Sequence, residues 1–233
     1  SGPLLRAICS LGVSPFLNQM AMFLVQITLN NTLTYYGALS HYGEDIPLAC
    51  VGVISKVNIL MLGFTLGISQ GCQPIFSYNY GARQYSRVRE AYRKAIVAAS
   101  VICCIAFVCF QLFPRPIVAL FDPSGSEEYF QFAERYFRIY MFMTLANAFQ
   151  PITANFFTSI GKAKRGALIA LTRQVIFLIP LILIFPLFLG IDGVMYAGPI
   201  ADSAAVVVAL ALVTREMKRM PHVDEPVAAD TPV

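Results

Sequence analysis

Charged residues are scarce in this chain of 233 residues: they make up 13% of it, against roughly 25% in an ordinary soluble domain. Histidine is scarcer still, and His41 and His222 both fall in polar connections, where neither is placed to act as a base inside an apolar core. No serine–histidine–aspartate set, no pair of catalytic acids and no phosphate-binding glycine loop can be assembled from the remaining residues. We therefore expect no enzymatic activity and no cofactor.

A metal site and a disulfide framework are also missing from the pattern. The six cysteines lie in or beside apolar stretches, without metal-ligand spacing and without a neighbouring histidine: Cys9, Cys50, Cys72, Cys103, Cys104 and Cys109. Buried, unreactive thiols are the better interpretation. We expect no bound metal.

Apolar residues are abundant instead, at 57% of the chain, and the mean hydropathy is +0.65. A bilayer core of about 30 Å requires roughly 20 mostly apolar residues per helix. Six stretches meet this requirement: residues 13–36, 48–78, 91–113, 129–160, 168–189 and 194–213. The sequence therefore predicts an all-α membrane protein in which residues 1–219 form one unit of six transmembrane helices. Residues 220–233, rich in proline and acids, read as a disordered tail.

The charges separate by side of the membrane. The strip from Gln70 to Lys94 joins two apolar stretches and carries five basic residues and one acid. Eleven basic residues lie in the connections on the same side of the membrane as this strip, whereas the loops on the opposite side hold one basic residue and six acids. Positive loops resist translocation, so both chain ends are expected in the cytoplasm and the protein in the cytoplasmic membrane. Because the positive residues are juxtamembrane, we expect the lipid bilayer as their partner and no nucleic acid.

Uncharged polar side chains recur inside two of the spans at steps of three and four, which places each set on one helix face. The first span carries Gln19, Met22, Gln26 and Asn30, and the fourth carries Tyr140, Met143, Asn147 and Gln150. Lipid offers these amides no partner, so they point either at other helices or at a water-filled cavity. Two stripes that mix methionine, aromatic and amide groups favour a cavity for varied organic molecules, including cations.

Two charged residues within the predicted spans are candidates for a functional role. Lys56 is about nine residues into the second span, where insertion costs roughly 2.5–3.5 kcal/mol, so it is expected to face the cavity or a partner. Asp202 lies early in the sixth span and is a candidate for binding a coupling ion. Its alternative role is at a helix start just after Pro199. A pairing of Lys56 with Asp202 is left open.

A short motif recurs near the cytoplasmic ends of two spans. Gln73-Pro74-Ile75 closes the second span, and Gln150-Pro151-Ile152 follows 77 residues later in the fourth. The two prolines are hinge candidates, because proline frees backbone carbonyls and allows a bend. Chance reuse of a helix-ending pattern is the alternative. Gly63, Gly67 and Gly71, four apart on the second span, predict close approach of another helix.

The strip QPIFSYNYGARQYSRVREAYRKAI resembles the loop after the eighth helix in transporters of the multidrug and toxic compound extrusion (MATE) family. LGVSPFLNQ, FTSIGKAKRG, LTRQVIFLIPL and GIDGVMYAGPIAD agree with it in order. The nearest branch is the bacterial DinF-like one. The resemblance implies the C-terminal six-helix lobe of a twelve-helix transporter, with the N-terminal lobe as partner. It further implies export of cationic or amphipathic organic compounds by antiport with protons or sodium, as the lobes alternate about a central cavity. The chain begins without methionine, in keeping with a part of a larger protein.

One departure from the family concerns the coupling ion. Some branches carry acids on the helices that correspond to the first and fourth spans, but here the first span has Met22 and Phe23 and the fourth has Asn147 and Gln150. The DinF-like branch uses an acid on a helix outside this chain. We therefore expect the coupling site mostly in the other lobe. The alternatives are a flippase of lipid-linked saccharides from a related group and a non-transporting membrane scaffold.

Overall fold

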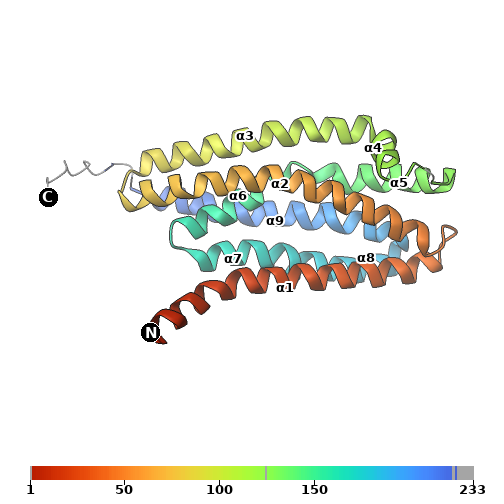
Figure 1. Ribbon diagram of the computed structural model, residues 1–233, viewed down its shortest axis with the longest axis horizontal. Coiled ribbons are helices and arrows are strands. Elements are labelled where there is room, and N and C mark those ends of the chain that lie inside the picture. The colour runs from red at the N-terminus through yellow and green to blue at the C-terminus, as the bar shows by residue number, and fades with distance from the viewer. Residues whose placement is uncertain (1, 124, 222–223, 225–233) are drawn as a thin grey trace.

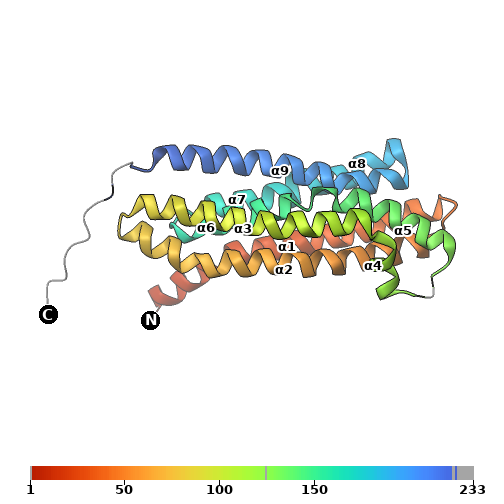
Figure 2. The same cartoon turned by 90° about the horizontal axis from the view of Figure 1, so that it is seen from above.

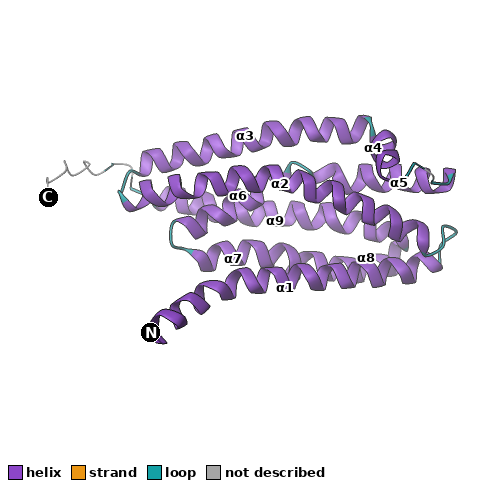
Figure 3. Cartoon of the chain, in the orientation of Figure 1, coloured by secondary structure: helices purple, strands orange, loops and turns teal. Residues whose placement is uncertain are grey.

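The computed structural model describes residues 2–123, 125–221 and 224, and these residues form helices joined by short turns, with no strand among them (Figures 1 and 3). In chain order the helices are α1 (Gly2–Ala38), α2 (Asp45–Gly81), α3 (Tyr85–Leu112), α4 (Pro114–Phe121), α5 (Glu127–Tyr140), α6 (Ala146–Ser159), α7 (Ala163–Leu171), α8 (Ile179–Leu189) and α9 (Ile191–Arg219). A single 3-10 turn, η1 (Met141–Met143), follows α5, and a π-helical segment, η2 (Thr172–Leu178), joins α7 to α8.

The predicted spans correspond to these helices. The first, second, third and sixth become α1, α2, α3 and α9, and the fifth becomes the continuous run α7–η2–α8. Within the described residues, four helical runs are long and apolar enough to cross a membrane: Asp45–Gly81, Tyr85–Leu112, Ala163–Leu189 and Ile191–Arg219. The predicted all-α membrane fold is confirmed.

Two features differ from the pattern of six plain spans. The fourth span is divided into α5 and α6 by η1 and the turn that follows it. The connection expected between the third and fourth spans contains α4, which begins at Pro114. Proline cannot continue the preceding helix, but its fixed φ suits the first turn of a new one, so α3 ends at Leu112 and α4 begins two residues later.

The long helices lie side by side along the bundle axis, and the start of α1 and the end of α9 lie at the same end (Figure 1). The α2–α3 and α6–α7 turns share that end, whereas the α1–α2 and α8–α9 turns and α4 lie at the opposite end. Seen from above, α9 runs along one side of the bundle (Figure 2). An even number of crossings requires this placement of the ends.

The core between α2, α3 and α6 is aromatic. Phe76 of α2, fully buried, contacts Phe156 of α6 edge to face with ring centroids 5.3 Å apart, and Tyr92 of α3 contacts the same ring at 5.0 Å. The Tyr92 hydroxyl shares a 2.7 Å hydrogen bond with Thr153 Oγ1. In a bilayer, close packing and hydrogen bonds of this kind hold helices together, because lipid tails are as apolar as the side chains.

The expected tail lies largely outside the described residues. Helix α9 ends at Arg219, and of the fourteen residues that follow it the structure describes Met220, Pro221 and Asp224. Met220 is buried, and the backbone carbonyls of Met220 and Pro221 accept hydrogen bonds from Arg89 Nη2 at 3.0 and 2.6 Å. These residues therefore lie against the start of α3.

Candidate functional site

An ion pair joins the fifth span to the sixth inside the lobe. Arg173 lies in η2, and its Nε donates a hydrogen bond of 2.5 Å to Oδ1 of Asp202 on α9. The two side chains are 14% and 11% exposed. Pro180 lies just beyond η2 and lacks the N–H that a regular α-helix would direct to the carbonyl of Ile176. A π-helical turn before such a proline accommodates the missing bond, and turns of this type are frequent at functional sites.

The pair lies near the middle of the bundle. Arg173 is ten residues into the run that starts at Ala163, and Asp202 is eleven residues into α9, which starts from the opposite end. At about 1.5 Å per residue, each is roughly 15 Å from the end where its helix starts. Charges at this depth are expensive unless they are paired. Each of the two residues therefore supplies the partner that the other requires.

Two of the predicted cavity residues lie next to this pair. Gln150 of α6 lines a narrow crevice together with Arg173, Asp202, Ala146 and Ala205, and its Nε2 donates to the carbonyl of Ile169 at 3.4 Å. Tyr140, at the end of α5, interacts electrostatically with both Arg173 and Asp202. The crevice leaves no room for a water-sized molecule, whereas small-molecule pockets have volumes of roughly 300–1,000 Å³. It is a site for charge and hydrogen bonds within the lobe.

The predicted stripe on α1 lies elsewhere, on the surface of the lobe. Gln19, Met22 and Gln26 are exposed, and Asn30 is half-buried. Gln26 Nε2 donates to Asn30 Oδ1 at 3.0 Å, so these two amides bond to each other along the helix. The opposite face of α1 carries the residues buried in the core: Ala21, Val25, Leu29 and Leu33. The stripe thus faces away from the lobe.

Lys56 is also exposed and does not meet Asp202, whose partner is Arg173. Among the described residues none forms an ion pair with Lys56. It shares one face of α2 with Gly52, Gly63 and Gly67, and a Cβ added at any of these glycines would contact nothing within 4 Å in the lobe. The close approach expected at Gly63, Gly67 and Gly71 is therefore not made inside this lobe.

Lys56 lies at the depth of Gln26 in the α1 stripe. Gln26 is twelve residues before the end of α1 at Ala38, and Lys56 is eleven residues after the start of α2 at Asp45. A short turn connects these antiparallel helices, so both side chains are roughly 17 Å from the hairpin.

The other predicted residues lie in or near the broken fourth span and on α2. Met143 is half-buried in η1, and Asn147 is in the first turn of α6, with its side chain outside the described part of the structure. Pro151 lies inside α6, and its carbonyl accepts a hydrogen bond from Ser69 Oγ at 3.4 Å. Pro74 is exposed inside α2, which continues to Gly81. The break at η1 precedes Pro151, and hinge motion at either proline stays a prediction.

Sequence reasoning overlooked two residues with buried ionic contacts. Arg173 is five residues into the predicted fifth span, where a charge resembles an ordinary helix-end residue. Glu216, 1% exposed on α9, contacts both Lys162 and Arg165 and so ties the α6–α7 turn to α9. The sequence feature that could have identified Glu216 is its position as a single acid among the basic residues at the end of α9.

Comparison with known proteins agrees with this fold. The chain matches the MatE family over residues 19–184. It is 23% identical to the multidrug export protein MepA of Staphylococcus aureus (strain MSSA476) over 212 residues, which are 90% of this chain and 44% of MepA. MepA of Staphylococcus haemolyticus (strain JCSC1435) gives the same identity and coverage. The chain spans about half the length of the curated relatives it matches.

Solved structures of the family superpose on the lobe. An outward-facing multidrug resistance MATE transporter of the MOP superfamily aligns with a TM-score of 0.83 at 20% identity, covering 94% of this chain and 48% of the other. An inward-facing one aligns with 0.84 at 20% identity, covering 94% and 49%. A MOP superfamily transporter from Pyrococcus furiosus aligns with 0.83 at 20% identity, covering 94% and 48%. The resemblance to the family and to half of such a transporter is confirmed, while the DinF-like branch stays a prediction. The chain belongs to the MatE family.

Proposed function

We propose that this lobe is one half of a secondary active transporter that exports cationic or amphipathic organic compounds by antiport with protons or sodium, rather than an enzyme or a scaffold. One observation carries the proposal. A lobe that spans half the length of its MatE relatives leaves the amide stripe of α1 exposed on its surface.

The exposed stripe requires a polar environment outside the lobe. Gln19 and Gln26 face away from the core, and lipid cannot satisfy amides inside the membrane. Lys56 is exposed on α2 at the depth of Gln26. A second half that covers this region and encloses water would provide partners for all three side chains. We therefore assign Gln19, Met22, Gln26, Asn30 and Lys56 to the wall of the central substrate cavity.

The likeness to solved structures supports movement of the lobe as a unit. It aligns over 94% of its length with an outward-facing and with an inward-facing transporter, with TM-scores of 0.83 and 0.84. A lobe whose internal geometry fits both states suits a mechanism in which the two halves rock as rigid bodies. Alternating access then occurs between halves. The α5–α6 break and the two prolines are the candidate places for smaller adjustments.

We assign the binding site of the coupling ion mostly to the other half of the transporter. Within this lobe Asp202 is the candidate carboxylate for a proton or sodium ion, but Arg173 already neutralises it at 2.5 Å. A cation that binds Asp202 must first displace a guanidinium that is itself buried. We propose that the pair mainly fixes the fifth span against the sixth.

The second candidate function is a flippase for lipid-linked saccharides. Its supporting observation is Lys56, an exposed cation at cavity depth that would attract a pyrophosphate headgroup. The relative from Pyrococcus furiosus is described as having a binding pocket of reverse polarity that suggests a different function, so pocket charge varies within this fold. One lysine beside several amides favours the exporter.

Drug efflux in cells tests the proposal. The complete transporter is expressed in bacteria that lack their own efflux pumps, and retention of a fluorescent cationic dye is measured. We expect lower retention with the transporter, and a return toward the level of empty cells when Gln26 and Asn30 are both changed to leucine. The control is Ile105→Leu, on the exposed face of α3. Equal retention with and without the transporter contradicts export of cations.

A further inference from the structure

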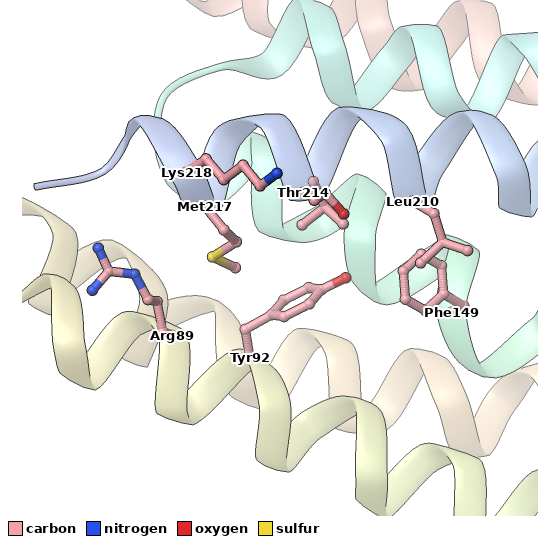
Figure 4. A pocket seen from close by; sticks show the side chains of 8 residues that line it. Arg89, Tyr92, Phe149, Leu210, Thr214, Met217 and Lys218 are labelled. Atoms are coloured by element: carbon pink, nitrogen blue, oxygen red, sulfur yellow. The ribbon is translucent and has the colours of Figure 1, made fainter. Parts of the chain in front are cut away.

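A second cavity lies between α3, α6 and α9 (Figure 4). It lies toward the end of the bundle that holds the start of α3 and the end of α9. It has a volume of about 430 Å³, within the range of ligand pockets, and its lining is almost entirely apolar. The lining residues come from all three helices: Arg89, Tyr92, Phe149, Leu210, Val213, Thr214, Met217 and Lys218. This cavity is separate from the Arg173–Asp202 site and from the stripe on α1.

The cavity has an apolar interior that opens sideways to the outside of the bundle. Tyr92 and Val213 are buried and form its floor, whereas Leu210 is 43% exposed at its edge. Leu210 is nine residues before the end of α9, so the cavity extends roughly 13 Å from that end into the membrane-spanning part. An occupant must therefore present apolar atoms along two to three helical turns.

Both cations of the cavity lie at its membrane-surface end. Arg89 is four residues after the start of α3, and Lys218 is the last residue but one of α9 (Figure 4). Arg89 uses Nη2 for its bonds to the carbonyls of Met220 and Pro221 and interacts electrostatically with Asp224, and no hydrogen bond to the described residues uses its Nε or Nη1. The guanidinium therefore has donors left for an oxyanion.

We propose that this cavity binds an anionic phospholipid of the cytoplasmic leaflet. The headgroup phosphate contacts Arg89 and Lys218, and an acyl chain lies along Phe149, Leu210 and Val213. Basic pockets between helices on the cytoplasmic side suit such headgroups. An organic cation is disfavoured by two like charges, and a small soluble anion leaves the apolar volume empty. The assignment uses the orientation with both ends in the cytoplasm and is independent of the transported substrate.

The C-terminal segment offers the competing occupant. Asp224 accepts a 2.9 Å hydrogen bond from the backbone N–H of Ser86 and also contacts the Ser86 hydroxyl, so an acid of the tail already lies beside the start of α3. The sequence beyond it, EPVAADTPV, adds two further acids. The experiment must separate lipid from tail.

Native mass spectrometry of the complete transporter measures the lipid directly. Protein in detergent is titrated with phosphatidylglycerol or with phosphatidylcholine, and bound lipids are counted. The test variant is Arg89→Gln with Lys218→Gln. Its matched control is Arg87→Gln with Arg215→Gln, which removes the same charge from exposed residues of the same two helices outside the cavity lining. Leu210→Trp fills the cavity and leaves both cations in place. Lys218→Gln alone changes one exposed side chain and guards against misfolding.

We expect wild type to bind phosphatidylglycerol in preference to phosphatidylcholine. The test variant should lose about 30-fold in phosphatidylglycerol affinity and Lys218→Gln about fivefold, because each juxtamembrane cation contributes about a fivefold factor. Leu210→Trp should also lose binding, and the matched control should keep it. Equal losses in the test and control pairs mean diffuse surface attraction and overturn the proposal, as does retained binding in Leu210→Trp.

Deletion of residues 224–233 decides between the two occupants, because it removes Asp224 together with the acids that follow it. Unchanged phosphatidylglycerol binding supports the lipid as the occupant. Increased binding that is reversed by the added peptide DEPVAADTPV identifies the tail as the occupant and overturns the proposal.

Discussion

Arg173 and Asp202 connect two spans across the interior of the lobe through a hydrogen bond of 2.5 Å between Nε and Oδ1. One residue lies in a π-helical turn and the other in the middle of α9, and both side chains are largely excluded from the surface. Because neither charge has another opposite charge in contact among the described residues, removal of one leaves the other uncompensated. The pair therefore behaves as a unit.

Neutralising one member of this pair should destabilise the transporter more than neutralising both. Asp202→Asn or Arg173→Gln alone leaves a buried charge, which costs about 3–5 kcal/mol, whereas the double variant leaves two neutral polar groups. We expect thermal unfolding of the purified complete transporter to show a large fall in Tm for each single variant and a partial recovery for the double. A fall in the double variant equal to the sum of the two single ones contradicts coupling between the residues.

Glu216 should contribute more to stability than either of the two basic residues it contacts. Glu216→Gln removes the shared anion and leaves Lys162 and Arg165, each more than a third exposed, to water, so we expect a loss of about 1–3 kcal/mol. Lys162→Gln should cost less because Arg165 still pairs with Glu216. The control is Glu90→Gln, which breaks an exposed pair with Lys94 and should leave Tm unchanged. Equal effects of Glu216→Gln and Glu90→Gln contradict the assigned role.

Substitution by alanine should affect stability differently at two glycines, Gly193 and Gly63. A Cβ on Gly193 would lie 2.5 Å from the backbone carbon of Phe185, at the tight turn between α8 and α9, so Gly193→Ala should cost about 1–3 kcal/mol. A Cβ on Gly63 meets nothing within 4 Å in the lobe. Gly63→Ala should therefore leave the stability of the lobe unchanged or raise it through better helix propensity. Chemical denaturation of the two variants measures the change in the free energy of unfolding. An unchanged stability of Gly193→Ala contradicts the close packing of the α8–α9 turn.

Lys56 separates the exporter from the flippase. If the cavity receives organic cations, Lys56 repels them, so Lys56→Gln should lower the KM for a cationic dye by roughly two- to tenfold and keep the maximal rate. If the cavity receives a pyrophosphate headgroup, the same change should remove transport of the lipid-linked saccharide. Both assays use one preparation of the variant. An increase in KM for the dye contradicts the position of Lys56 in a cation cavity.

Composition and hydropathy were enough to predict where the spans lie, but not where a span is broken inside. Long apolar stretches bounded by basic residues located α2, α3 and α9, because the length of a bilayer core fixes the length of a helix. The division of the fourth span at η1 was not predicted, because Met141–Met143 is as apolar as its surroundings and contains no proline or glycine. The 3-10 turn at this place therefore depends on tertiary packing and not on the local sequence.

Three residues of the Arg173–Asp202 site were selected from the sequence, and their roles in a substrate cavity or in ion coupling stay predictions. Asp202, Gln150 and Tyr140 were selected from the sequence as polar residues in apolar stretches, and the fold brings them to one place. Arg173 was overlooked because no pattern shows which buried acid a given arginine will meet across two helices. Likewise the stripe on α1 was recognised from its spacing, but its position on the surface follows from the packing of Val25 and Leu29 against the other helices.

Export by antiport is tested most directly with the complete transporter in liposomes. A fluorescent cationic dye is enclosed, and its movement is followed first under an imposed proton gradient and then under a sodium gradient. We expect dye movement that depends on one of the two gradients and that Gln26→Leu with Asn30→Leu reduces. Dye movement under neither gradient, with protein that is folded and correctly inserted, contradicts the antiporter.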